Sequence, residues 1–262
     1  MSTPVTIPEI PETRPDALRR VGPAWHTVVL ILVLLANSLA GALSHHVPGL
    51  PHWLHGLEKP TDAVPKAMAT YLGTILLETI LTVYVLWGVR RSGMRIRDFI
   101  GGRWNTPERF LIDVVIAVAF WFASHIVLLG AVVLVKHFSP ATLDRVLKVV
   151  TGLAPRSRLE IVLALTLSVV VGIAEEIVFR GYLQRQFAAW SHSVAAGIVL
   201  SALVFGMSHG YQGAIFMSII ALYGAMFGLL AHFAKSLRPG MLSHFMNDAI
   251  ALLLARVVKV PS

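Results

Sequence analysis

Long apolar segments alternate with short polar connections along nearly the whole chain. Each apolar segment is rich in leucine, valine, isoleucine and alanine and contains few ionisable residues. The segments lie at about residues 25–44, 66–88, 110–138, 159–178, 193–208, 211–234 and 240–258. A helix needs about 20 apolar residues to cross the hydrocarbon of a bilayer, and most of these segments are long enough. The pattern therefore predicts an all-α fold, a polytopic transmembrane helical bundle of about seven to eight membrane helices.

The composition also indicates a membrane protein. Hydrophobic residues make up 56% of the 262 residues and charged residues 14%, whereas a soluble domain has about 25% charged residues. The net charge of +8 is not taken as a sign of nucleic-acid binding, because the basic residues lie mainly between apolar segments and no binding module accompanies them. We expect no nucleic-acid partner. The chain has no cysteine, which excludes disulfides, thiolate metal sites and cysteine nucleophiles.

The placement of arginine and lysine predicts which side of the membrane each connection faces. The 89–109 connection carries six arginines and is predicted to be cytoplasmic, as is the N-terminus. The 45–65 connection then faces outward, and its histidines are interpreted as part of a wet loop rather than a metal site: His45, His46, His52 and His55. The 139–158 connection disagrees, since it carries several basic residues although it is predicted to face outward. Leu143, Val146, Leu147 and Val150 recur there at helical spacing, which is typical of an interfacial amphipathic helix.

These features divide the chain into four regions. Residues 1–24 contain five prolines and mixed charges, which predicts a flexible cytosolic N-terminal tail rather than a signal peptide. We expect N-terminal membrane helices at 25–138, an amphipathic or loop segment at 139–158, and a second group of membrane helices at 159–258. The pair Gly224 and Gly228 indicates either a close helix–helix contact or glycines that a membrane helix merely tolerates.

The fourth apolar segment ends in charged residues that are candidates for chemistry. Glu175, Glu176 and Arg180 follow a run from Ile161 to Ala174 that has no ionisable side chain. An ionisable residue at the centre of a membrane helix costs about 2.5–3.5 kcal/mol on insertion scales, so it is a functional candidate. Glu176 and Arg180 have the spacing of a helical ion pair, while Glu175 points about 100° away toward another helix. We expect one structural and one reactive acid; the alternative is an interfacial charge cluster that ends the helix.

Two further polar groups follow in later apolar segments. His209 comes directly after the fifth segment, and taken alone it is more typical of an interfacial or hydrogen-bonded histidine than of a ligand. His244 and Asp248 lie one helical turn apart in the last segment, with Asn247 beside them. Three polar groups at membrane depth need partners within the bundle. The sequence Arg238-Pro239-Gly240 predicts where this last helix begins.

Together these groups are suited to peptide hydrolysis. The reaction needs a base that activates water and a donor that holds the oxyanion, and a glutamate in an apolar site can be that base. Two histidines and a carboxylate would also suit zinc with an open position for water. Glu175, His209, His244 and Asp248 are therefore candidate metal ligands. The chain has no His-Glu-xx-His sequence, a water activated by glutamate alone fits the residues equally well, and we favour a site with little or no metal dependence.

The three groups, in this order, resemble the motifs of a known family. Glu175-Glu176-xxx-Arg180, Phe205-xxx-His209 and His244-xxx-Asp248 are similar to those of the CPBP intramembrane metalloprotease family. That family includes the type II CAAX prenyl endopeptidases and bacteriocin-processing, Abi-like proteins. The resemblance covers about residues 160–250, and it implies a membrane protease that cuts a peptide bond near the cytoplasmic membrane face.

The resemblance also implies roles and partners. Glu175 would be the catalytic glutamate, Glu176 and Arg180 its supporting pair, and His209, His244 and Asp248 the rest of a catalytic core at 159–258. The expected partners are a peptide substrate, which could be prenylated, and the lipid bilayer, and the expected location is a bacterial inner (cell) membrane. Asparagine also occurs in the family at the last position. Because an ionised aspartate cannot donate to an oxyanion, Asp248 must be protonated, bind a metal or orient His244, unless Asn247 donates instead.

Two other classes of protein remain alternatives. A non-proteolytic immunity or scaffold protein could retain the family fold for partner binding. A proton-coupled transporter would also place acids and histidines in the membrane, but the polar groups lie at helix ends rather than at the midplane. Glu78, in the middle of the second segment, is predicted to form a hydrogen bond with another helix rather than to line a cavity.

Overall fold

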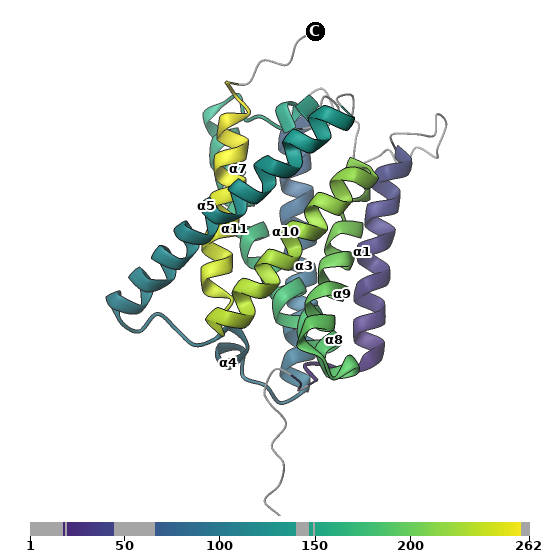
Figure 1. Cartoon of the computed structure of the whole chain (residues 1–262), viewed down its shortest axis with the longest axis vertical. Coiled ribbons are helices and arrows are strands. Elements are labelled where there is room, and N and C mark those ends of the chain that lie inside the picture. Colours follow the sequence, from purple (N-terminus) through teal and green to yellow (C-terminus); the bar gives the residue numbers. More distant parts are fainter. Residues whose placement is uncertain (1–17, 19, 45–65, 140–146, 149, 258–262) are drawn as a thin grey trace, which may run out of the picture.

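The computed structural model describes residues 18, 20–44, 66–139, 147, 148 and 150–257. The 45–65 connection, most of the N-terminal tail and the predicted amphipathic positions Leu143 and Val146 lie outside these residues. Every regular element in the described part is a helix (Figure 1). In chain order the elements are α1 (Ala24–Ser44), α3 (Lys66–Arg91), α4 (Ile96–Ile100), α5 (Pro107–Phe138), α7 (Arg158–Glu175), η2 (Glu176–Leu183), α8 (Gln184–Ser191), α9 (Val194–Met207), η3 (Gly210–Gln212), α10 (Ala214–Ala234) and α11 (Arg238–Leu254). The predicted all-α bundle is confirmed.

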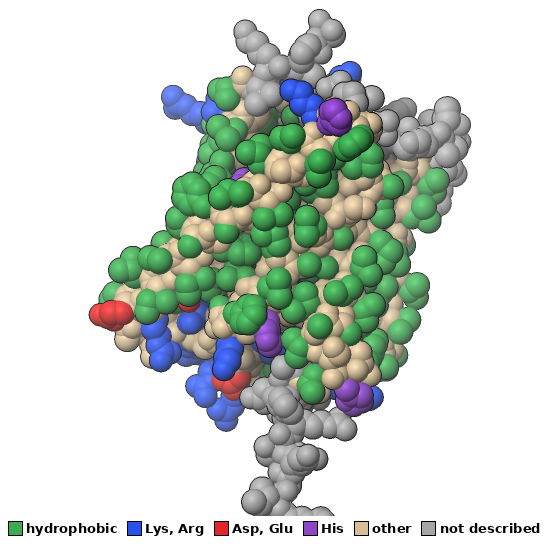
Figure 2. Space-filling model, in the orientation of Figure 1, with side chains coloured by type: hydrophobic (Ala, Val, Ile, Leu, Met, Phe, Trp, Pro, Cys, Tyr) green, Lys and Arg blue, Asp and Glu red, His purple; other side chains and the backbone are tan. Residues whose placement is uncertain are grey.

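Each predicted apolar segment contains one of the long helices. Five helical runs are long and apolar enough to cross a membrane, and α9 and α11 are shorter, with 14 and 17 residues. Apolar side chains cover the face of the bundle that Figure 2 shows, between its two ends. α5, with 32 residues, crosses this face diagonally (Figure 1). The protein is an integral membrane protein.

The fourth apolar segment does not end near residue 178, as its hydropathy predicted. α7 continues through the π-helical η2 and through α8, forming one helical run of 34 residues from Arg158 to Ser191. The prediction was wrong because charged residues normally end a span, whereas here their charges are paired inside the bundle. Every residue from Ala174 to Gln184 is buried, which is typical of a helix surrounded by others. Glu175 therefore lies midway along the run.

Local sequence signals set the ends of the helices around this run. The hydroxyl of Ser157 accepts a hydrogen bond from the Glu160 backbone N–H at 3.2 Å, and the Glu160 carboxylate accepts one from the Ser157 N–H at 2.8 Å. This capping box starts α7. α11 begins at Arg238 with Pro239 in its first turn, as the sequence predicted.

The arginine-rich connection lies against the link between α10 and α11. The Leu237 backbone N–H donates to the Ile100 carbonyl oxygen at 2.9 Å, and the Arg185 guanidinium donates to the Phe99 carbonyl oxygen at 2.9 Å. α4, the start of α11 and Arg185 therefore share one end of the bundle. That this end faces the cytoplasm remains a prediction.

α8 and α9 pack together through Gly197. A Cβ atom added at Gly197 would lie 2.5 Å from the Gln184 carbonyl oxygen and 2.9 Å from the Ala188 backbone nitrogen. Because backbone atoms cannot easily move aside, Gly197→Ala is expected to lower the free energy of unfolding by about 1–3 kcal/mol. The matched control is Gly130→Ala in α5, where no atom lies within 4 Å of the added Cβ. Equal unfolding temperatures of the two variants in detergent would contradict the close contact.

Candidate active site

The Glu176–Arg180 ion pair lies in the centre of the bundle. The Glu176 side chain is 0% exposed and that of Arg180 2%, and Arg180 Nη1 lies 3.1 Å from Glu176 Oε1. Arg180 Nη2 donates to the Gly224 carbonyl oxygen at 3.3 Å, and the guanidinium lies 4.4 Å from the centroid of the Phe205 ring. The ion pair predicted from the four-residue spacing is confirmed, and it connects η2 to α9 and α10.

Gln184 extends this row of polar residues by one more turn. Its Nε2 donates to the Gly228 carbonyl oxygen at 3.1 Å. A Cβ atom on Gly224 would lie 2.8 Å from Phe205 Cδ1, and one on Gly228 would lie 2.7 Å from Gln184 Oε1. The two glycines therefore form a close helix–helix contact, in which Arg180 and Gln184 reach the α10 carbonyls. The sequence analysis missed Gln184, although its spacing from Arg180 could have revealed it.

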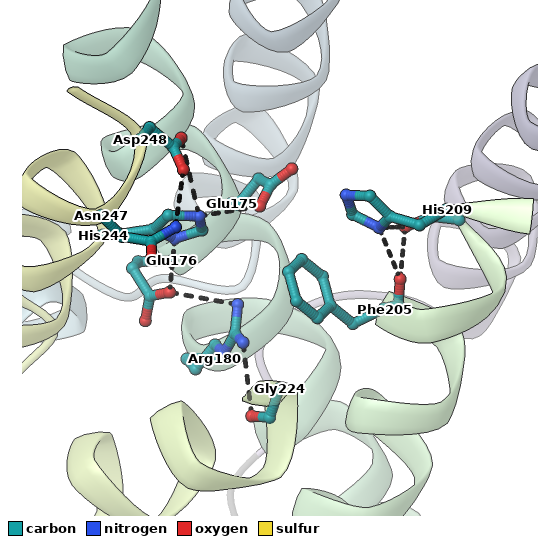
Figure 3. A network of polar contacts seen from close by, with 10 residues as sticks. Glu175, Glu176, Arg180, Phe205, His209, Gly224, His244, Asn247 and Asp248 are labelled. Carbon is teal, nitrogen blue, oxygen red and sulfur yellow. Dashed lines mark hydrogen bonds and ion pairs between the residues drawn. The ribbon is translucent and has the colours of Figure 1, made fainter. Parts of the chain in front are cut away.

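His244 connects the two adjacent acids (Figure 3). Its Nδ1 lies 3.2 Å from Glu176 Oε1, and its Nε2 lies 3.3 Å from Glu175 Oε2. α11 approaches η2 closely because Gly240 has no side chain; a Cβ atom there would lie 2.8 Å from Glu176 Oε2. A neutral imidazole carries one N–H and an imidazolium two. Contacts from both nitrogens to carboxylates therefore fit an imidazolium, or a neutral ring beside one protonated carboxyl.

Asp248 lies on the far side of His244, one turn along α11. Its Oδ2 is 3.9 Å from His244 Nε2, and its Oδ1 accepts a hydrogen bond from Asn247 Nδ2 at 3.0 Å. The Asp248 side chain is 25% exposed, against 5% for His244. His244 Nε2 thus faces two carboxylates, those of Glu175 and Asp248. Among the roles open to Asp248, this geometry favours orientation of His244.

His209 lies apart from the other predicted site residues. Its Nδ1 is hydrogen-bonded to the Phe205 carbonyl oxygen at 2.9 Å. The centroid of the Phe205 ring lies 5.0 Å from that of His209 and 6.5 Å from that of His244. In the described part of the chain no hydrogen bond or ion pair joins His209 to Glu175, although His209 interacts electrostatically with His244 and Asp248. In Figure 3 its other ring nitrogen points toward the side on which Glu175 lies.

Glu78 faces the site from α3. It lies two helical turns from both Tyr71 and Val85, which are 0% exposed, so all three occupy the inward face of the helix. α3 packs along α7, and Glu78 interacts electrostatically with Glu175 and His244. Among the described residues, none forms a hydrogen bond or ion pair with the Glu78 side chain. The predicted hydrogen bond to another helix is therefore not found, and Glu78 is directed toward the site.

Four of the site residues have the chemistry of zinc ligands, but their arrangement does not fit a metal centre. Within the described ranges no three His, Asp or Glu side chains converge closely enough to hold an ion. His244 Nε2 contacts Glu175 and Asp248 directly, whereas no hydrogen bond or ion pair joins His209 to either acid in the described part of the chain.

Residues 157–250 match the family model Rce1-like, described as Type II CAAX prenyl endopeptidase Rce1-like. This region of the chain is therefore similar to the Rce1-like family. The match confirms the resemblance that the motifs indicated, and it contains every predicted site residue. α1, α3, α4 and α5 lie outside the matched region. No curated protein and no solved structure matches the chain.

At the level of the family, the match supports a protease with a peptide substrate in a membrane lipid environment. The geometry adds a distinction between the two adjacent acids. Glu176 is fully buried and contacts both Arg180 and His244, whereas Glu175 retains 8% exposure and forms an ion pair with His244 alone among the described residues. The division into a structural and a reactive acid stays a prediction, and these contacts show how the surroundings of the two acids differ.

Proposed function

We propose that the protein is an intramembrane endopeptidase of the CAAX-protease type, in which Glu175 activates the attacking water. The observation that carries the proposal is the unequal pairing of the two acids. The Glu176 carboxylate is held by Arg180 at 3.1 Å and by His244 at 3.2 Å. Glu175 pairs with His244 alone among the described residues and, unlike the fully buried Glu176, keeps 8% exposure, so a water molecule can reach its second oxygen.

In the proposed reaction Glu175 acts first as a base and then as an acid. Its carboxylate takes a proton from water while the water oxygen attacks the scissile carbonyl carbon. The carbonyl oxygen becomes an oxyanion, and the candidate donor that stabilises it is the second ring nitrogen of His209, which carries a proton when this imidazole is protonated. Glu175 then gives the proton to the amide nitrogen as the C–N bond breaks. An acid and an amine leave, and the Glu175 carboxylate is ionised again.

The proposed site lies inside the membrane but nearer the end predicted to be cytoplasmic. His244 is six residues from the start of α11 at Arg238, which corresponds to about 9 Å of helix. A scissile peptide bond would therefore enter the bundle from that end. If the substrate is prenylated, its lipid chain would remain among the apolar side chains or in the bilayer of a bacterial inner (cell) membrane.

The proposal is tested with purified full-length protein and a panel of fluorogenic peptides, prenylated and unprenylated. We expect cleavage of at least one peptide class and little loss of activity after treatment with a metal chelator. A large loss that zinc restores would show that a metal takes part in the reaction. Preference for prenylated over unprenylated peptides of the same sequence would identify the substrate class.

A proton-coupled transporter is the rival function that the structure makes more plausible. The sequence disfavoured it because the polar groups were expected at helix ends. Glu175 instead lies midway along a helical run of 34 residues. Flux in proteoliposomes under a proton gradient, with no peptide cleavage, would favour the transporter. A scaffold or immunity protein would show neither activity, and its cellular phenotype would survive replacement of Glu175.

A further inference from the structure

A basic pocket lies at the end of the bundle predicted to be cytoplasmic, outside the candidate active site. It is a cavity of about 460 Å³ whose lining is formed by arginines and two apolar residues: Arg90, Met94, Arg95, Ile96, Arg97 and Arg103. We call it the arginine pocket. Its residues come from the end of α3, from α4 and from the connections on either side of α4. Lys and Arg side chains gather below the apolar surface at this end (Figure 2).

The wall of the arginine pocket is fixed to the bundle through α4. Phe99 is 0% exposed, and its ring lies against Gly181, where an added Cβ atom would be 2.6 Å from Phe99 Cζ. The Phe99 carbonyl oxygen accepts a hydrogen bond from Arg185, and that of Ile100 accepts one from Leu237. α4 is thus held both through the Phe99 side chain and through its backbone, so the arginines are attached to a segment whose position is fixed.

Most of the positive charge in the pocket is not compensated within the described part of the chain. Arg97 forms an exposed ion pair with Asp98 at 3.1 Å. The side chains of Arg90, Arg95 and Arg103 form no ion pair or hydrogen bond with any described residue. Guanidinium groups bind phosphate oxygens in a bidentate geometry. The pocket therefore has the chemistry of a phosphate site.

Tryptophans indicate the depth of the pocket in the membrane. Trp87 and Trp104 are 42% and 44% exposed, and each lies within three residues of a pocket arginine. Trp25 is 54% exposed, with its ring centroid 6.3 Å from that of Trp87. Exposed tryptophans concentrate at the level of the lipid headgroups. The arginine pocket is consequently placed where phospholipid phosphates lie, rather than in bulk solvent.

We propose that the arginine pocket binds the phosphate of an anionic phospholipid. The guanidinium groups contact the phosphate oxygens, and Met94 and Ile96 contact the glycerol part of the lipid. Basic pockets on the cytoplasmic side of membrane proteins are suited to such headgroups. The proposal does not depend on proteolysis, since it concerns a surface separate from Glu175.

The test measures binding of labelled phosphatidylglycerol to the full-length protein in a neutral detergent. The pocket variant is Arg90→Gln/Arg95→Gln/Arg103→Gln. The matched control removes the same charge from a second basic pocket that contains three basic residues: Lys148→Gln/Arg156→Gln/Arg256→Gln. We expect the pocket variant to bind phosphatidylglycerol at least about tenfold more weakly than wild type, and the control variant to bind as wild type does. Phosphatidylcholine, which has no net charge, is expected to compete poorly.

Three outcomes would overturn the proposal. Equal weakening in the two triple variants would show that total charge, not the pocket, attracts the lipid. Equal competition by phosphatidylcholine would remove the preference for an anionic headgroup. Displacement of the lipid by millimolar inorganic phosphate would assign the pocket to soluble phosphate compounds. Unfolding temperatures without added lipid check the fold of each variant, and the single Arg103→Gln substitution replaces the triple variant if that one fails to fold.

Discussion

Glu175→Gln is expected to abolish peptide cleavage while the protein stays folded. The amide has nearly the size of the carboxyl group and can still contact His244, which lies 3.3 Å from Glu175 Oε2, but it cannot take a proton from water. General-base catalysis contributes about 10²–10⁴-fold, so kcat/KM should fall by at least that factor. The measurement is a fluorogenic peptide assay on wild type and variant at matched protein concentrations.

The matched control is Glu108→Gln, which changes an exposed acid at the start of α5. We expect it to cleave peptide at the wild-type rate, so that a loss of activity in Glu175→Gln cannot come from a change of net charge. Unfolding temperatures of the two variants should stay near that of wild type. If folded Glu175→Gln protein still cleaved peptide at the wild-type rate, Glu175 would not be the base and the role would pass to another acid, with Glu78 as one candidate.

Hydropathy was sufficient to predict the helices but not how far one of them continues. Apolar side chains must face lipid or other helices, so every long apolar segment of the sequence corresponds to a helix. The segment that contains Glu175 was expected to end near residue 178, yet the helix runs on to Ser191. Its continuation depends on partners such as the Gly224 carbonyl oxygen, 44 residues away along the chain. Hydropathy describes only neighbouring residues along the chain, so it cannot predict a contact with a residue so distant in the sequence.

The candidate site could be predicted in part because helical spacing is also local. The four-residue spacing of Glu176 and Arg180 correctly gave their ion pair. The sequence could not show that His244 inserts between Glu175 and Glu176, because this contact requires the packing of α11 on η2. The sequence also grouped His209 with the others, and this grouping stays a prediction, because no hydrogen bond or ion pair joins His209 to Glu175 in the described part of the chain. The positions of these side chains relative to one another depend on contacts between helices, which helical spacing along the sequence does not predict.

Arg180→Met is expected to destabilise the protein more than any other single change considered above. The substitution fills a similar volume but leaves the Glu176 carboxylate, which is 0% exposed, without its cationic partner. Removing one partner of a buried ion pair costs about 3–5 kcal/mol, because an uncompensated charge stays in the interior. The free energy of unfolding would be measured by reversible denaturation in mixed micelles.

The double variant Glu176→Gln/Arg180→Met separates the ion pair from the packing of Arg180. With both charges absent the buried charge no longer needs compensation, and the glutamine oxygen can still contact His244 Nδ1, which lies 3.2 Å from Glu176 Oε1 in the wild type. We therefore expect the double variant to be more stable than Arg180→Met alone. If the two variants were equally destabilised, the loss would come instead from the contacts of the guanidinium with the Gly224 carbonyl oxygen and the Phe205 ring. A cost of Arg180→Met below about 1 kcal/mol, typical of a surface pair, would contradict the burial of the ion pair itself.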